Sequence, residues 1–232
     1  MKLPFLSSNR RRENGREDPQ AYAKERERMV RDQLAERGIT DIRVLDAMRR
    51  VPRHLMVEEA LRFRAYQDRP LPIGEGQTIS QPFIVALTCQ ALSLRGAERV
   101  LEIGKGSGYQ TAILAELVEK VYTIERLKSL GTRARDQLET LGHHNVAGRI
   151  ADGTLGWPEE SPFDAIVVAA CSPEVPAPLK EQLAEGGRMV IPIGETHEQD
   201  LIRVTKERGE TRLEKLSDCV FVKLVGKHGW KS

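Results

Sequence analysis

The chain has 232 residues, of which 40% are hydrophobic, 30% are charged and 5% are aromatic, and its formal net charge is +2. This length can bury one sizeable core without disulfides or metal ions. The absence of a long apolar run or a secretory signal excludes a membrane-spanning protein and predicts a cytoplasmic one. Cys89, Cys171 and Cys219 lie far apart in the sequence, so we expect free thiols and no metal site.

Charge is unevenly distributed along the chain. Residues 1–31 contain nine Lys or Arg and five Asp or Glu, so this segment carries +4 and the remainder −2. Residues 1–18 have no periodic apolar face, which predicts a disordered basic arm. Such an arm could contact nucleic acid or anionic lipid. Because Arg10, Arg11 and Arg12 lack interleaved aromatic residues, we expect neither partner.

Residues 19–95 are predicted to form a helical cap that includes one long loop. Gly38 can end a first helix, and Thr40 or Asp41 can cap a second. Residues 66–82 contain three prolines and two glycines, which predicts a loop, and a loop this long usually has a function. From the apolar periodicity, helices are expected over residues 20–37, 42–51, 54–63 and 83–94.

Residues 96–232 alternate between buried strands and amphipathic helices, which is typical of a parallel sheet covered on both faces. Two consecutive strands at the end predict an antiparallel addition. No linker interrupts residues 19–232, so we expect a single domain. Strands are expected over 99–104, 120–125, 146–152, 163–170, 188–194, 200–207 and 211–226, and helices over 107–118, 129–142 and 176–187.

The most informative segment is VLEIGKGSGYQ, residues 100–110, in which glycines follow a buried strand and precede a helix. Glycines there let the backbone turn sharply and approach a ligand, and the helix N-terminus can bind an anionic group. The spacing of Gly104, Gly106 and Gly108 fits neither the dinucleotide-binding G-x-G-x-x-G pattern nor a Walker loop. With Glu102 two positions before the first glycine, it resembles the first motif of class I S-adenosylmethionine-dependent methyltransferases.

Two later strand ends support this interpretation. Glu125 ends the second strand about 20 residues after the glycines, where a carboxylate can bind both hydroxyls of a ribose. Asp152 and Gly153 end the third strand, where the resemblance places the adenine. The implied cofactor is S-adenosyl-L-methionine.

Longer segments narrow the resemblance to one family. GEGQTISQPFIVA (74–86), ADGTLGWPEESPFD (151–164) and CVFVKLVGKHGW (219–230) resemble protein-L-isoaspartate O-methyltransferases, and the resemblance runs from about Met29 to Trp230. It implies a doubly wound, mostly parallel Rossmann-like sheet with an N-terminal helical cap and C-terminal antiparallel strands. It also implies methyl transfer to the free carboxylate of L-isoaspartyl residues in damaged peptides and proteins, which initiates repair through a succinimide.

The chemistry of this reaction is consistent with the residues present. An isoaspartyl carboxylate has a pKa near about 4 and is already ionised at neutral pH, so it needs no general base. Methyl transfer then depends on positioning and desolvation. Ser80 matches the family's active-site serine and would orient the carboxylate. The resemblance assigns cofactor binding to Gln77, Thr78, Ile79, Gly104, Gly106, Gly108, Glu125, Asp152 and Gly153.

Two positions depart from the family pattern. Lys105 lies in the glycine loop, where the family usually has Thr or Ser, and it could pair with the cofactor's carboxylate, crowd it or extend to solvent. We expect its side chain to extend to solvent. Lys223 replaces a proline in the tail that is expected to flank the peptide site.

Three alternatives compete with this interpretation. One is a carboxyl methyltransferase with another substrate, and another is a catalytically degenerate module that only binds S-adenosylmethionine. The third is a nucleic-acid methyltransferase. The third is disfavoured because residues 170–173, Ala-Cys-Ser-Pro, stand where its catalytic motif would follow the fourth strand.

Overall fold

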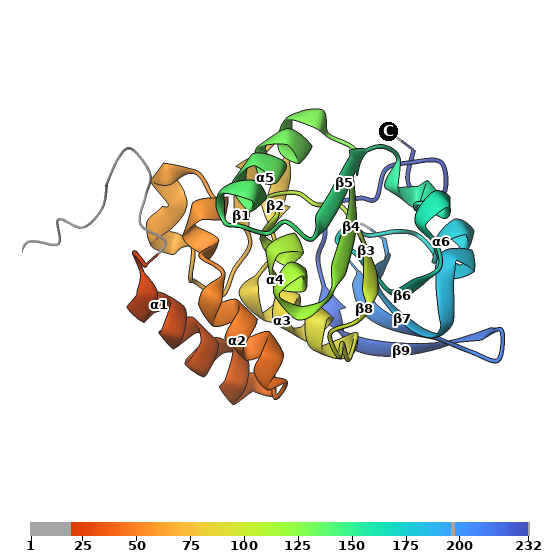
Figure 1. Ribbon diagram of the computed structural model, residues 1–232, viewed down its shortest axis with the longest axis horizontal. Helices are drawn as coiled ribbons and strands as arrows, with labels where there is room; N and C mark the ends of the chain where they lie inside the picture. The colour runs from red at the N-terminus through yellow and green to blue at the C-terminus, as the bar shows by residue number, and fades with distance from the viewer. Residues whose placement is uncertain (1–19, 196–197, 232) are drawn as a thin grey trace, which may run out of the picture.

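The structure, a computed structural model, describes residues 20–195 and 198–231 (Figure 1). The basic arm predicted over residues 1–18 lies outside these described residues. No helix within the described ranges is both long and apolar enough to cross a membrane. The N-terminal part comprises α1 (Ala23–Arg28), η1 (Met29–Leu34), η2 (Ala35–Arg37), α2 (Ile42–Arg50), η3 (Arg53–Met56), η4 (Glu59–Arg64), β1 (Leu71–Gly74), β2 (Gln77–Ile79) and α3 (Pro82–Ala91).

Local sequence signals set the limits of the first helices. Asp41 caps α2, because its carboxylate accepts hydrogen bonds from the backbone N–H groups of Arg43 and Val44 at 2.9 and 3.4 Å. Gly38 follows η2 with a φ of 93°, in the left-handed region that glycine adopts freely. Both residues therefore act as the sequence predicts.

The α-helix expected over residues 54–63 is a wrong prediction. This part of the chain forms the two short 3-10 helices η3 and η4 instead. Tertiary contacts override the helical pattern, because the ring of His54 lies 2.8 Å from the hydroxyl of Tyr66 and Arg53 Nε donates a 2.7 Å hydrogen bond to the carbonyl of Ala65. These contacts fix the connection between α2 and β1.

The loop expected over residues 66–82 contains a short antiparallel hairpin, β1–β2. Leu71 pairs with Ile79 across it, and Gly74 at the end of β1 and Gly76 in the turn have φ values of 86° and 67°. Strands of three or four residues that include a proline show too little alternation to be recognised from sequence. The hairpin is therefore a correction to the sequence analysis.

Seven strands form the main sheet, in the order β5-β4-β3-β6-β7-β8-β9. β3, β4, β5, β6 and β7 are parallel, whereas β8 and β9 are added antiparallel. This confirms the doubly wound sheet with C-terminal antiparallel strands. The elements are β3 (Arg99–Ile103), α4 (Tyr109–Leu117), β4 (Lys120–Glu125), α5 (Lys128–Thr140), β5 (Val146–Ile150), η5 (Gly153–Leu155), η6 (Pro158–Glu160), β6 (Phe163–Val168), α6 (Ala177–Gln182), β7 (Leu183–Gly194), β8 (Gln199–Glu207) and β9 (Glu210–Cys219).

The helix expected over residues 176–187 is shorter than predicted. α6 ends at Gln182, and β7 begins at the next residue because Leu183 pairs with Phe163 of β6. The pairing register of β6 and β7 then shifts before Arg188. The glycines at 186 and 187 therefore lie within an irregular strand and do not end a helix.

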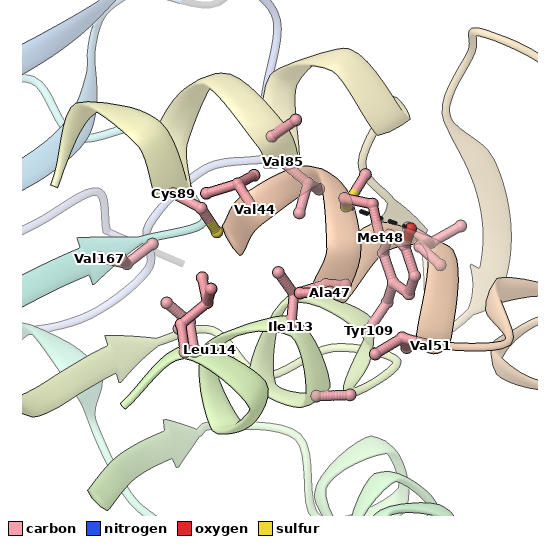
Figure 2. Packing of buried hydrophobic residues seen from close by; sticks show 14 of the residues in the cluster. Val44, Ala47, Met48, Val51, Val85, Cys89, Tyr109, Ile113, Leu114 and Val167 are labelled. Atoms are coloured by element: carbon pink, nitrogen blue, oxygen red, sulfur yellow. Dashed lines mark hydrogen bonds between the residues drawn. The ribbon is translucent and has the colours of Figure 1, made fainter. Parts of the chain in front are cut away.

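The two faces of the sheet bury separate hydrophobic clusters, because alternate strand residues point to opposite faces. Val100 belongs to the cluster under the N-terminal helices, and Leu101 belongs to the cluster on the other face. In the first cluster, the hydroxyl of Tyr109 donates to the sulfur of Met48 at 3.5 Å (Figure 2). This contact joins the start of α4, directly after the glycine loop, to α2. Figure 2 labels Val44, Ala47 and Met48 of α2 and Val51 directly after it, Val85 and Cys89 of α3, Tyr109, Ile113 and Leu114 of α4, and Val167 of β6.

Candidate active site

A cavity of about 390 Å³ opens at the carboxyl ends of β3, β4 and β6. β3 and β6 are neighbours at the point where the strand order reverses, and ligands of open parallel sheets bind at this switch point. We refer to this cavity as the loop cleft. Its lining brings together most of the predicted cofactor residues, namely Gln77, Thr78, Ile79, Gly104, Gly106, Glu125 and Gly153.

The glycine loop has a backbone shape that requires its glycines. Gly104, Gly106 and Gly108 have φ values of 87°, 54° and 85°, all in the left-handed region. Gly108 does not line the loop cleft itself; a side chain there would contact α5, because an added Cβ would lie 3.3 Å from Ala134 Cβ. The loop therefore passes close to α5 and leaves the cleft open in front of Gly104 and Gly106.

Glu125 is buried at the end of β4 and is held by two backbone groups. One carboxylate oxygen accepts a 2.9 Å hydrogen bond from Gly106 N–H, and the other accepts one of the same length from Leu127 N–H. An ionised carboxylate offers about four acceptor positions, so two remain for a ligand. Glu125 thus has a fixed orientation and free acceptor capacity at the cleft, which is what a ribose diol requires.

Gly153 and Asp152 occupy different environments. Gly153 lines the loop cleft, and an added Cβ would lie only 2.4 Å from Ile103 Cγ2. Asp152 is not among the lining residues of this cleft. Its carboxylate accepts hydrogen bonds from Thr154 N–H at 2.9 Å and from Lys227 N–H at 2.8 Å. Burial alone would raise the pKa of Asp152, but these hydrogen bonds outweigh burial and lower it.

A second cavity, of about 650 Å³, lies beside the loop cleft. We refer to it as the tail cavity, because residues 219–222 of the C-terminal tail form part of its wall. Gln199 of β8 holds this wall in place: Phe221 N–H donates to its side chain at 2.6 Å, and its amide nitrogen donates to the carbonyl of Phe221 at 3.1 Å. The two cavities share four lining residues, Thr78, Ser80, Ala169 and Val222.

Ser80 lies at the boundary between the two cavities. It follows β2 directly and is half-buried, between the hairpin and the start of α3. A group held in one cavity can therefore meet a group held in the other next to this residue. The sequence analysis predicted that Ser80 orients the substrate carboxylate and that the tail flanks the peptide site.

The sequence analysis missed the part of the tail cavity formed by β8 and β9. Lys215 lies there between two carboxylates, 2.7 Å from Asp200 and 2.8 Å from Asp218. These three residues meet in the cavity wall only because β8 and β9 pair, which brings Asp200 opposite Asp218. No motif marks these residues.

The prediction that Lys105 extends to solvent is wrong. The residue is 6% exposed, and its side chain lies beneath the glycine loop against β5. Burial lowers the pKa of the Lys105 ammonium, while the carboxylates of Glu102 and Glu125 oppose this decrease.

Lys223, the other residue that departs from the family pattern, is exposed. Its ammonium lies 4.9 Å from the centre of the Trp230 ring.

Glu102 is fully buried and hydrogen-bonded to two neighbouring elements. The hydroxyls of Thr111 in α4 and Thr123 in β4 donate to the same carboxylate oxygen, at 2.6 and 2.8 Å. Burial raises the pKa of Glu102 to about 7, although these hydrogen bonds and the charge of Lys105 oppose the rise. The carboxylate therefore links β3 to the first turns of α4, directly behind the glycine loop.

Comparisons with known proteins agree with this arrangement. A sequence model of the protein-L-isoaspartate(D-aspartate) O-methyltransferase family matches residues 24–229. The protein-L-isoaspartate O-methyltransferase of Syntrophus aciditrophicus is 57% identical over 212 residues, which cover 90% of this chain and 97% of the relative. The enzyme of the same name from Geobacter metallireducens is 57% identical over 206 residues, which cover 88% and 95% of the two chains.

Two solved structures are similar over most of the chain. One, described as a protein-L-isoaspartate O-methyltransferase, has a TM-score of 0.80 and 29% identity, and the match covers 88% of this chain and 67% of that one. The other, from Plasmodium falciparum, carries the same description and is in complex with S-adenosyl-L-homocysteine. Its TM-score is 0.75 at 30% identity, with 86% of this chain and 98% of that chain covered.

Proposed function

Because the chain belongs to the protein-L-isoaspartate(D-aspartate) O-methyltransferase family, we propose that the loop cleft binds S-adenosyl-L-methionine and the tail cavity binds an isoaspartyl segment. The enzyme transfers a methyl group from this cofactor to the free carboxylate of an L-isoaspartyl residue and so initiates repair through a succinimide. The observation that carries the proposed assignment is the wall shared by the two cavities, in which Ser80 lies.

The residues of the loop cleft fit the cofactor. Glu125 would accept hydrogen bonds from the ribose hydroxyls through its free acceptor positions, and Gly104 and Gly106 would allow close approach of the methionine part. Gln77, Thr78 and Ile79 would cover the cleft from the hairpin. Gly153 would face the adenine, while Asp152 would hold Gly153 in place through the tail. When bound, S-adenosylmethionine supplies an electrophilic methyl group on its sulfonium.

Ser80 would act on the substrate side of the shared wall. Its hydroxyl would donate a hydrogen bond to one oxygen of the isoaspartyl carboxylate and leave the other oxygen free to attack. No proton has to be removed, because the carboxylate is already ionised at neutral pH. The catalytic contribution of the protein would therefore be alignment of the two groups and exclusion of water by the hairpin and the tail.

We also propose that residues 19–232 act as one methyltransferase domain in the cytoplasm. The cluster in Figure 2 supports the single domain, because α2 and α3 pack on the same core as α4 and β6. The free thiols of Cys89, Cys171 and Cys219 are typical of a reducing compartment. No observation favours a degenerate binding module or another carboxylate substrate.

Transfer of labelled methyl groups to matched peptides tests this function. Two peptides of identical sequence, one with an L-isoaspartyl and one with an aspartyl residue, would be incubated with the protein and labelled S-adenosylmethionine. We expect base-labile label on the isoaspartyl peptide only, since the product is a methyl ester. Equal labelling of both peptides, or label that survives base, would contradict the proposed function.

A further inference from the structure

The tip of the β1–β2 hairpin, residues 74–76, has an unusual backbone. Gly74, Glu75 and Gly76 have φ values of 86°, 53° and 67°, so three consecutive residues are in the left-handed region. Glycine adopts this region freely, but a glutamate there is strained, because its Cβ comes too close to the following carbonyl oxygen. Strained residues persist only where the surrounding structure holds them, and they are concentrated at functional sites. The contacts of the Glu75 side chain should therefore explain why a glutamate stands at this tip.

Two residues of α5 hold the hairpin at its tip. Ser129 Oγ donates a 2.7 Å hydrogen bond to the Glu75 carboxylate, and the guanidinium of Arg133 donates one to the backbone carbonyl of Ile73. Ser129 and Arg133 are four positions apart, so they lie on the same face of α5. Within residues 20–195 and 198–231, no other hydrogen bond joins Ile73 or the tip to another element. Figure 1 shows the hairpin beside α5.

The hairpin needs such contacts because it is small. β1 and β2 have four and three residues, and a two-stranded hairpin is marginally stable at best by itself in water. Apolar packing holds its strands, since Leu71, Ile73 and Ile79 are buried in the core. Ile73 also lies close to the glycine loop, because a Cβ added to Gly106 would be 3.5 Å from Ile73 Cδ1. The tip is exposed and has no such packing, so its position depends on α5.

The segment after the clamped tip forms one wall of the loop cleft. Residues 76–79 line this cleft from the hairpin, and Leu130 lines it from α5. Ser129 directly precedes Leu130, so its hydrogen bond to Glu75 joins two walls of the same cavity. A shift of the tip away from α5 would open the cleft between these two walls.

We propose that Ser129 and Arg133 are positioning residues that clamp the hairpin tip. Through Glu75 and Ile73 they hold residues 77–79 against the bound cofactor. The proposal rests on the assignment of the loop cleft to S-adenosylmethionine. Neither Ser129 nor Arg133 lines this cleft, so each acts through the hairpin. Without the clamp, cofactor binding would have to order the tip as well, and the affinity would fall because of this entropic cost.

Removal of either clamping side chain should weaken cofactor binding. We expect Ser129→Ala and Arg133→Met each to weaken binding of S-adenosylhomocysteine by about twofold to tenfold in calorimetric titrations, as for one lost hydrogen bond. Ser129→Thr keeps the hydroxyl and should retain the affinity of the unsubstituted protein. Thr132→Ala, at an exposed residue of the same helix, is the matched control and should leave the affinity unchanged.

Glu75→Asn separates loss of the clamp from a general loss of stability. Asparagine adopts the left-handed region more readily than glutamate, and its side chain is one methylene shorter. This variant should therefore keep or raise the melting temperature, but lose the contact with Ser129 and bind S-adenosylhomocysteine as weakly as Ser129→Ala does. Glu75→Asn and Ser129→Ala together should weaken binding no more than either alone, because both remove the same interaction.

Unchanged affinity in Ser129→Ala or in Arg133→Met would overturn the proposal. Losses that multiply when Glu75→Asn and Ser129→Ala are combined would also overturn it, since the two side chains would then act independently. Failure of the proposed function would look different, because the unsubstituted protein would then bind no S-adenosylhomocysteine.

Discussion

The backbone N–H of Gly106 donates a 2.9 Å hydrogen bond to the carboxylate of Glu125, so the glycine loop and the end of β4 are fixed relative to each other. The two residues lie 19 positions apart and face the same cleft. Any ligand that contacts Glu125 therefore also meets the backbone of the glycine loop. The position of the Glu125 carboxylate and the shape of the loop depend on each other.

Glu125→Ala should weaken S-adenosylmethionine and S-adenosylhomocysteine to the same extent, since both carry the same ribose. Loss of hydrogen bonds to a charged group costs about 1–3 kcal/mol, or roughly 5- to 150-fold in affinity. Calorimetric titration with both ligands measures the effect. Glu125→Gln keeps one acceptor oxygen, so its affinity for each ligand should lie between those of the unsubstituted protein and of Glu125→Ala. Unchanged affinity for both ligands in Glu125→Ala would exclude the proposed ribose contact.

Glu102→Gln should change how stability depends on pH. The pKa of Glu102 is raised to about 7 in the folded protein by burial, above the value of about 4.3 expected when unfolded. The folded state therefore binds the proton more tightly, and the contribution of this group to stability falls as pH rises from about 4 to 7. Compared with the unsubstituted protein, the glutamine variant should gain stability across this range, on the order of 3–4 kcal/mol.

Denaturant unfolding at pH 5 and pH 8 measures this difference. A constant gap between the two proteins at both pH values would show that Glu102 does not change its protonation there. Thr111→Val, which removes one hydrogen bond to the same carboxylate without removing the charge, is a suitable comparison and should raise the pKa of Glu102 further.

Much of this arrangement follows from local patterns in the sequence, and the remainder depends on contacts between distant segments. The positive φ values of Gly104, Gly106 and Gly108 agree with what a glycine-rich turn after a buried strand predicts. The burial of Lys105 could not be predicted, because the end of its side chain lies beside Gly148 only once β4 and β5 have paired.

The hairpin and the part of the tail cavity formed by β8 and β9 escaped prediction for related reasons. β2 has three residues, too few for a periodic pattern, and its pairing with β1 places Ile79 and therefore Ser80. The ion pairs of Lys215 depend on the register of β8 and β9, which is weakly specified by sequence because β9 is mostly exposed and polar.

Lys215→Met should alter substrate selection and leave cofactor binding unchanged. The lysine lines the tail cavity and offsets one of the two negative charges of Asp200 and Asp218, so its loss makes this wall more acidic. Because these ion pairs are exposed and screened by solvent, the free energy of unfolding should change little. The KM should fall for isoaspartyl peptides with flanking lysines and rise for those with flanking aspartates.

Added salt should reduce these differences in KM, because the charges are exposed and screened. Adding Asp218→Asn to the Lys215→Met variant removes one of the two negative charges of this wall and should partly restore the original selectivity. Equal KM changes for both kinds of peptide would place the substrate away from this wall.

The central claim, that the cofactor and the isoaspartyl carboxylate meet at Ser80, is tested most directly by Ser80→Ala. Its kcat/KM for an isoaspartyl peptide should fall by roughly 5- to 150-fold, as expected for one lost hydrogen bond to a charged group worth about 1–3 kcal/mol. The affinity for S-adenosylhomocysteine should stay within twofold of the unsubstituted protein, and Ser161→Ala, at a serine that lines neither cavity, should change neither quantity. Full turnover in Ser80→Ala would contradict the claim.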